Sequence, residues 1–265
     1  MTRIGSTLLV PLSALAMSCV RFGEGTSPDT GEGGVVSLDA ALTDHFCSSL
    51  LPAPTFCDDF DDLSPGSRWD KVAQAGKASF DTTSFRSAPR AFLVTPDANS
   101  ATYSAVYLAR AESRLATSIH VAFETRFGGT FPSDVALIWS LEFDVAPRQQ
   151  DGAALADATA GSMAASIVGA GARALFGDNP VGGSFKSREL AKAFKIDQWT
   201  RVEFDLTLDV PHVAIRLDGT TVLDEGLQPA WRPRYVTFRI GYLPLSNQAH
   251  AAFSTRVDNV IFDVK

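Results

Sequence analysis

Residues 135–147, VALIWSLEFDVAP, carry the strongest strand signal in the chain. Apolar side chains occupy every second position, and the positions between them are mostly small or polar. Such alternation, with one uninterrupted apolar face, is typical of a strand that packs on a core. It places Glu142 and Asp144 side by side on the opposite face. The apolar face comprises Val135, Leu137, Trp139, Leu141, Phe143 and Val145.

The composition of the whole chain agrees with a strand-rich fold. Of the 265 residues, 45% are hydrophobic, which is enough for a sizeable core. The 18 Phe, 20 Gly and 14 Pro favour strands and turns over helices. The net charge is −7, and the sequence contains no run of Lys or Arg. Because phosphate binding needs a concentrated basic face, we expect no nucleic-acid partner.

Further strands are predicted on both sides of the opening stretch. Residues 119–127, 199–209 and 235–242 alternate in the same way. Asp218-Gly219 lies between two alternating segments, which is a strong hairpin signal. The last strand, residues 253–264, changes its apolar parity at Asp258-Asn259, so we expect a bulge there. The sequence therefore predicts an all-β fold, a two-layer antiparallel β-sandwich.

Three segments interrupt this pattern. Residues 149–161 are Ala-rich and polar, and they predict a long loop. Residues 170–183 are Gly-rich. Residues 187–194, SRELAKAF, predict a two-turn helix capped by Ser187.

The N-terminus has the features of an export signal. Arg3 precedes a short apolar run, residues 8–17, which is too short to span a bilayer. Two cleavage interpretations stay open: a small-x-small site at residues 14–16, or a lipobox-like AMSC ending at Cys19, which would carry a lipid. Residues 21–34 are rich in Gly, Ser, Thr, Pro and acidic residues, which is typical of a flexible tether.

These features divide the chain into three parts. We expect residues 1–19 to form a signal peptide with a lipobox-like end, residues 20–46 a flexible tether and docking segment, and residues 47–265 the sandwich domain. Export leads to an oxidising compartment, where Cys47 and Cys57 are predicted to form a disulfide. Two free buried thiols are the alternative.

Six motifs stand out along the predicted sandwich: FCDDFDD (56–62), Trp69, SAPRAFLV (87–94), WTRVEFDLTL (199–208), VAIRLDG (213–219) and VDNVIFDV (257–264). Together they resemble the concanavalin A-like lectin/glucanase superfamily, and more narrowly laminin-G-like jelly rolls in exported bacterial proteins. The resemblance covers roughly residues 56–264 and implies a concanavalin A-like jelly roll whose first and last strands are neighbours. Because the superfamily holds lectins, adhesion modules and glycosidases, function must come from the site.

The resemblance also implies where a catalytic site would lie. Family-16-like glucanases carry a Glu-x-Asp-x-(x)-Glu strand, and Glu142 and Asp144 match its first two positions. The third acid is missing, because Ala146 and Pro147 stand there. A retaining mechanism needs a second carboxyl about 5–5.5 Å from the first, so we expect no catalytic residue here. Two alternatives stay open for this pair: solvated carboxylates, or polar contacts to a sugar.

An acidic cluster opens the predicted sandwich. Several carboxylates close together suit Ca²⁺, which prefers oxygen ligands. Related jelly rolls often hold a structural Ca²⁺ between their first and last strands, which implies Asp58 and Asp258 as ligands. A solvated acidic turn is the alternative. The cluster comprises Asp58, Asp59, Asp61 and Asp62.

Aromatic and histidine residues are further candidates for a site. Trp231, within QPAWRPR, is the tryptophan expected to be most exposed and able to stack on a sugar, although packing on the sandwich edge is an equal alternative. No GxSxG, HExxH or P-loop motif occurs. The four histidines are scattered in sequence and are expected to be surface residues rather than metal ligands: His45, His120, His212 and His250.

Three functional hypotheses follow. The first is a surface-anchored, non-catalytic module that binds a polysaccharide or glycan through Glu142, Asp144 and Trp231. The second is a glycoside hydrolase with an unrecognised acid, and the third is a structural envelope protein with no small ligand. In each case we expect a monomer that contacts a membrane only through a lipid anchor at Cys19. We expect the protein in the cell envelope, as an outer-membrane or cell-surface lipoprotein, with secretion as the alternative.

Overall fold

The computed structural model describes residues 45–61, 67–74, 76–96, 105–131, 135–144, 159–168, 173–180, 186–227, 233–244 and 253–265. Several predicted features therefore lie outside the described residues: the signal segment with Cys19, the tether, Asp62, residues 145–158, Trp231 and His250. Within the described part, no helix is long and apolar enough to cross a membrane. The helical structure found there is a short 3-10 helix, η1 (Phe46–Ser49).

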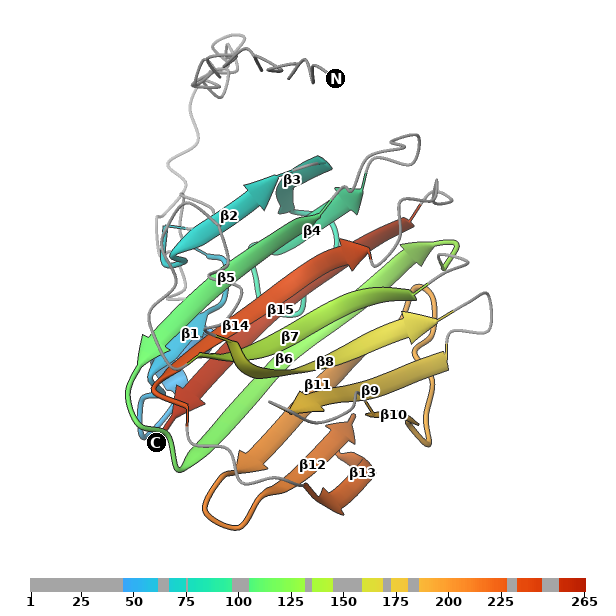
Figure 1. Ribbon diagram of the computed structural model, residues 1–265. Helices are drawn as coiled ribbons and strands as arrows, with labels where there is room; N and C mark the ends of the chain where they lie inside the picture. Colours follow the sequence, from blue (N-terminus) through green and yellow to red (C-terminus); the bar gives the residue numbers. More distant parts are fainter. Residues whose placement is uncertain are drawn as a thin grey trace, which may run out of the picture. The chain divides into compact units, whose positions relative to one another are not determined.

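Two antiparallel sheets make up the fold (Figure 1). The eight-stranded sheet has the order β13-β12-β11-β6-β15-β4-β3, with β1 paired to β15. Its strands are β1 (Phe56–Asp58), β3 (Gly76–Asp81), β4 (Ala91–Pro96), β6 (Ser118–Gly129), β11 (Trp199–Thr207), β12 (His212–Leu217), β13 (Thr220–Gly226) and β15 (Phe253–Val264).

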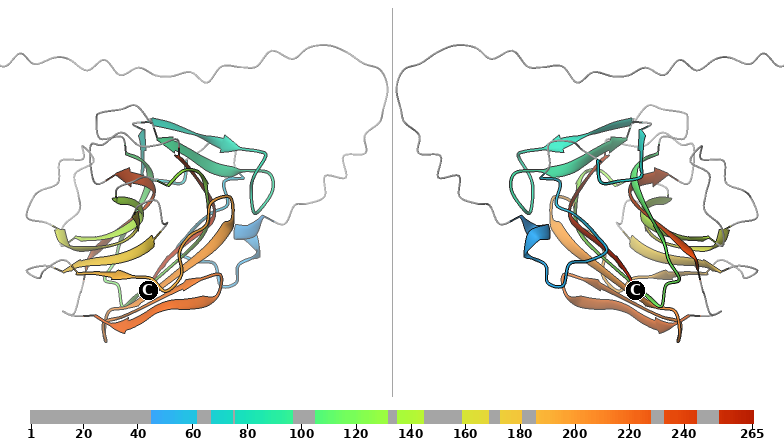
Figure 2. Two further views of the ribbon diagram at one scale, coloured as in Figure 1. Left: turned by 90° about the vertical axis from the view of Figure 1, so that its right-hand side faces the viewer. Right: turned by 90° about the vertical axis from the view of Figure 1, so that its left-hand side faces the viewer.

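The seven-stranded sheet has the order β10-β9-β8-β7-β14-β5-β2. Views turned by 90° show the two sheets as curved layers that face each other (Figure 2). The predicted two-layer β-sandwich is confirmed. The strands of the seven-stranded sheet are β2 (Lys71–Gln74), β5 (Val106–Ser113), β7 (Val135–Asp144), β8 (Thr159–Val168), β9 (Arg173–Pro180), β10 (Lys186–Glu189) and β14 (Tyr235–Pro244).

The core lies between the sheets and is built largely from aromatic rings. Trp139 of β7 meets Phe204 of β11 edge to face, with ring centroids 4.9 Å apart. Phe238 of β14 meets Phe262 of β15 at 5.5 Å. All four side chains are fully buried. The alternation that predicted these strands therefore also predicted which of their faces turn inward.

The first and last strands are neighbours, as the resemblance implied. Phe56 of β1 lies opposite Phe262 of β15. The expected bulge is present, because the register of β15 against β6 shifts between Asp258 and Ile261, and Asn259 has a positive φ of 52°.

The predicted hairpin is also confirmed. β12 and β13 are joined at Asp218 and Gly219, which have φ values of 50° and 74°. Two successive positive φ angles are the geometry of a type I′ turn, which suits the twist of paired strands.

Two sequence predictions were wrong. The helix predicted at residues 187–194 is absent: β10 (Lys186–Glu189) pairs there with β9, and residues 190–194 are irregular. Tertiary pairing overrides local propensity here, because Arg188 of β10 bonds the buried Asp178 of β9 at 2.8 Å. The long loop predicted at residues 149–161 ends too late, because β8 already begins at Thr159.

Candidate functional site

The two faces of β7 have different surroundings. Trp139 and Phe143 point into the core and are fully buried. Ser140 and Glu142 therefore point away from the other sheet, onto what we call the outer face of the seven-stranded sheet. Asp144 ends β7 opposite Tyr235, and its side chain is outside what the structure describes.

An arginine from the neighbouring strand pairs with the carboxylate. In the register between β14 and β7, Thr237 lies opposite Glu142 and Arg239 lies opposite Ser140. Arg239 Nη1 forms an ion pair with Glu142 Oε1. The Arg239 guanidinium also lies over the ring of Tyr107 on β5, 5.3 Å from its centroid. One guanidinium thus connects three strands of the sheet.

A glycine sets this arrangement. Gly241 lies opposite Tyr107 in the register and has a φ of 140°. A Cβ at this position would lie 2.4 Å from the Val106 carbonyl oxygen, far inside contact distance. Only a residue without a side chain allows β14 to approach β5 so closely, and this approach brings the Tyr107 ring beside Arg239.

The centre of the outer face is screened from solvent. The Glu142 and Arg239 side chains are only 13% and 20% exposed, and Ser140 is 4% exposed. Among the described residues, neither the Ser140 hydroxyl nor Arg239 Nε has a hydrogen-bond partner. Buried polar groups without partners are uncommon in folded proteins and are a reason to look for a ligand.

Together these residues form what we call the Arg239 cluster: Tyr107, Ser140, Glu142 and Arg239. It offers guanidinium and hydroxyl donors, a carboxylate acceptor and an aromatic ring. A sugar ring presents hydroxyls at its edge and C–H groups on its faces, so this set of groups can hold one. The carboxylate of Glu142 is ion-paired with the Arg239 guanidinium. The second acid that a retaining glycosidase needs is missing at positions 146 and 147 of the sequence.

The two residues predicted to bind calcium are buried and hydrogen-bonded. Asp58 accepts bonds from Trp69 Nε1 at 2.6 Å and from the Phe60 N–H at 2.9 Å. Asp258 accepts bonds from the backbone N–H groups of Arg86, Ser87 and Asn259 and from the Ser87 hydroxyl. Burial raises the pKa of Asp258 to about 7, although these donors lower it. Calcium binding at Asp58 and Asp258 stays a prediction.

A second polar cluster lies on the outer face of the eight-stranded sheet. It borders a cavity of about 270 Å³ that His120, Asp205 and Lys265 help to line. His120 Nδ1 lies 2.7 Å from Asp205 Oδ1, and Arg216 Nη1 lies 2.6 Å from Asp205 Oδ2. The His120 hydrogen bond holds the pKa of Asp205 below its usual range. The Asp205 carboxylate thus lies between His120 and Arg216, two side chains that can each carry a positive charge.

Sequence reasoning found Glu142 but missed its partners. The alternation in residues 235–242 predicted that Arg239 faces away from the core, and no site residue was predicted near Tyr107. No local pattern indicates that β14 lies between β7 and β5, because those strands are far apart in sequence. The contacts of Arg239 with Glu142 and Tyr107 follow from the strand order, in which β14 lies between β7 and β5.

Sequence comparisons find no protein-family model and no curated protein that matches this chain. Comparison with solved structures does find matches. A glucuronan lyase, endo-β-1,4-glucuronan lyase from the fungus Trichoderma reesei, is 15% identical with a TM-score of 0.61, covering 80% of this chain and 96% of that one.

Two further structures share the architecture. The cellulose-induced protein Cip1 is 13% identical with a TM-score of 0.56, covering 79% of this chain and 97% of that one. The globular domain of T. cruzi calreticulin is 11% identical with a TM-score of 0.51, covering 79% and 88%. At such low identity, the likeness establishes a shared β-sandwich fold.

Proposed function

We propose that this protein binds a polysaccharide on the outer face of its seven-stranded sheet, through the Arg239 cluster. The observation that carries the proposal is the position of Arg239, between the carboxylate of Glu142 and the ring of Tyr107. An aromatic ring beside paired donors and acceptors is the arrangement that holds a sugar ring.

Two further observations support this proposal. The Ser140 hydroxyl and Arg239 Nε are buried groups for which the described residues supply no hydrogen-bond partner. Sugar hydroxyls both donate and accept, so they are chemically suited to pair with both groups. A structural neighbour is named for its action on a glucuronan, which is a polysaccharide. Asp144 and Trp231 stay predicted contributors to the same binding surface.

The proposed role is binding without cleavage. Glu142 matches the nucleophile position of the glucanase motif, but it is ion-paired with Arg239 and lacks the third acid. The alternatives are a glycoside hydrolase with an unrecognised acid and a structural envelope protein with no small ligand. Each alternative has its own signature in one experiment.

That experiment incubates residues 47–265 with a panel of neutral and acidic polysaccharides. Binding is measured by affinity electrophoresis, and cleavage by a reducing-sugar assay. We expect binding without products, and binding should weaken in Arg239→Met and Tyr107→Ala. The matched control is Arg216→Met, which removes an arginine–aspartate pair from the outer face of the other sheet. Products would indicate an enzyme, and neither binding nor products would indicate a structural protein.

We further propose that the protein is exported and anchored by a lipid at Cys19. The AMSC sequence, the tether that follows it and the disulfide support this proposal, since structural disulfides are typical of exported proteins. We also propose that the sandwich is of the laminin-G-like type found in exported bacterial proteins. In Cys19→Ala we expect release of the protein from the membrane fraction. Retention of this variant in membranes would contradict the anchor.

A further inference from the structure

Three side chains that can bind a metal meet where the N-terminal segment joins the sandwich. His45 directly precedes η1, while Asp59 and Asp61 lie within three residues of the end of β1. One ligand atom from each of the three lies within 4.8 Å of the other two. The Cys47–Cys57 disulfide joins the same two segments, two residues from His45 on one side and two residues from Asp59 on the other.

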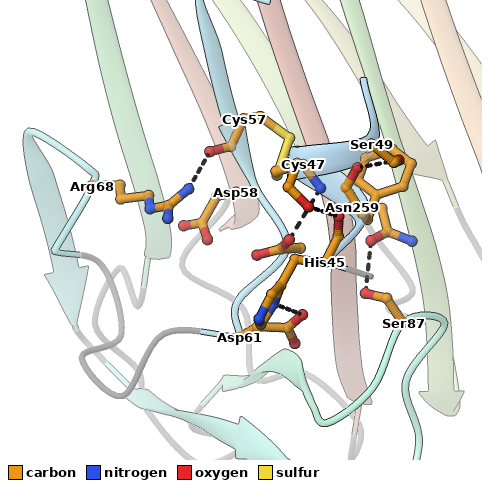
Figure 3. Close-up of a disulfide and its surroundings, with 12 residues drawn as sticks. His45, Cys47, Ser49, Cys57, Asp58, Asp61, Arg68, Ser87 and Asn259 are labelled. Carbon is orange, nitrogen blue, oxygen red and sulfur yellow. Dashed lines mark hydrogen bonds and ion pairs between the residues drawn. A yellow bond between two sulfur atoms is a disulfide. The ribbon is translucent and has the colours of Figure 1, made fainter. Parts of the chain in front are cut away.

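The contacts within this group leave one carboxylate oxygen without a partner. His45 Nδ1 lies 3.0 Å from Asp61 Oδ2. A dashed line marks this contact in Figure 3. The Cys47 N–H donates to Asp59 Oδ2 at 3.1 Å. The Asp61 side chain is only 1% exposed, and its Oδ1 has no hydrogen-bond partner among the described residues.

A buried carboxylate oxygen without a donor is unfavourable, because it has lost water and gained nothing in return. Arg90 is close, but its guanidinium donates to the Asp61 backbone carbonyl, at 2.9 Å. Asp59 adds a second buried carboxylate, with an exposed fraction of 3%. A cation bound by both carboxylates would compensate for the water that they have lost.

We propose that His45, Asp59 and Asp61 form a binding site for one divalent transition-metal ion of the zinc type. Imidazole nitrogen suits Zn²⁺ and its neighbours in the first transition row, whereas Ca²⁺ and Mg²⁺ prefer oxygen alone. Zn²⁺ accepts three protein ligands of this kind with a water as the fourth.

The present geometry is close to what such an ion needs. Zinc–ligand bonds of about 2.0–2.2 Å in a tetrahedron put neighbouring ligand atoms roughly 3.3 Å apart. The His45–Asp61 contact of 3.0 Å is already near this spacing. The His45 side chain is 54% exposed, so it can turn to close the rest of the group.

This site differs from the calcium site that the resemblance implied. Asp58 and Asp258 are not part of the group, and Asp58 turns to Trp69 in the core. The proposed site also uses a histidine that sequence reasoning placed among surface residues. An ion there would connect the N-terminal segment to the end of β1 at the joint that the disulfide already links.

The test is calorimetric titration of the metal-stripped, exported protein with ZnCl₂ alone. We expect one Zn²⁺ per chain, with affinity reduced more than about tenfold in His45→Gln and in Asp61→Asn, since losing even a supporting residue can cost that much. His45→Gln is the decisive variant, because its exposed side chain can be replaced without disturbing the core. The matched control is His120→Gln, which removes a histidine–aspartate pair elsewhere in the fold, His120–Asp205.

Each other result would overturn the proposal. One is the absence of Zn²⁺ binding by the wild type, and another is binding that His45→Gln leaves unchanged. A third is a loss of binding that is as large in His120→Gln as in His45→Gln. Titration with CaCl₂ alone provides a further check: Ca²⁺ binding as tight as Zn²⁺ binding, and independent of His45, would indicate an all-oxygen site.

Discussion

Arg239 on β14 and Glu142 on β7 form an ion pair across two neighbouring strands, on the face of the seven-stranded sheet that points away from the core. Alternation alone would make Glu142 an ordinary surface carboxylate. The pairing instead makes it one half of a screened contact, with exposed fractions of 13% for Glu142 and 20% for Arg239. Substitution of either residue by a neutral one therefore leaves the other charge without its ion-pair partner, at a position screened from solvent.

Removal of the Glu142 charge should lower the free energy of unfolding. We expect Glu142→Gln to cost about 1.5–3 kcal/mol, because hydrogen bonds to charged groups contribute about this much. Urea denaturation provides the measurement. Glu203→Gln is the control, because Glu203 pairs with Arg201 at a more exposed position, and it should change stability by less than about 0.5 kcal/mol. Equal losses of stability in the two variants would show that the lower solvent exposure of the Glu142–Arg239 pair does not strengthen it.

Trp139 should be among the most sensitive positions in the core. Trp139→Ala removes a fully buried ring that packs on Phe204, and a loss of about 3–5 kcal/mol is typical of such truncations. Trp139→Phe should cost less, since it keeps a ring in contact with Phe204. Thermal and urea unfolding provide the measurement, with Leu115→Ala, which is 61% exposed, as the control. A loss below about 1 kcal/mol would contradict the packing described.

Asp81 should make the fold sensitive to acid. Burial raises its pKa, but hydrogen bonds from Thr83 and Arg256 outweigh burial and bring the pKa from 3.8 to about 2. Because the folded-state pKa is the lower one, this stabilisation is fully present above about pH 4 and is lost as the pH falls through 2. Its size is roughly 2 kcal/mol.

We therefore expect Asp81→Asn to destabilise the protein at neutral pH and to flatten the fall in stability below about pH 4. Urea denaturation of both proteins across that range tests this expectation. An unchanged slope in Asp81→Asn would assign the acid sensitivity to other groups.

The predicted Cys47–Cys57 disulfide is present, with Cα atoms 5.7 Å apart. Loop-closure entropy for a sequence separation of 10 residues gives a stabilisation of about 2–3 kcal/mol. The double substitution Cys47→Ser, Cys57→Ser should lower stability by this amount, as measured by urea denaturation under oxidising conditions. Alkylation of two thiols in the native wild-type protein under those conditions would contradict the bond.

Local patterns in the sequence were sufficient for much of the sandwich. The strand at residues 135–144, the Asp218-Gly219 hairpin and the bulge at Asp258 follow from alternation and turn chemistry within a few residues. The errors have a common physical cause. β10 lies where a helix was expected, because pairing with β9 and the Arg188–Asp178 contact outweigh local preference.

The candidate site was harder to predict for the same reason. Glu142 is found from its own strand, but its partner Arg239 lies nearly a hundred residues later, and Tyr107 belongs to a third strand. Similarly, His45 meets Asp59 and Asp61 through the fold of the N-terminal segment rather than through a spacing motif. Contacts of this kind depend on strand order, which alternation does not specify.

β15 is the last strand of the chain, yet it lies in the interior of its sheet, with β6 on one side and with β4 and β1 on the other. A chain made from its N-terminus therefore lacks the middle of this sheet until residues 253–264 have been synthesised. Until then β6 and β4 each present an unpaired edge, which is open to pairing with other chains. A product that terminates before Phe253 cannot close this sheet, so the eight-stranded sheet can form only after β15 has been made.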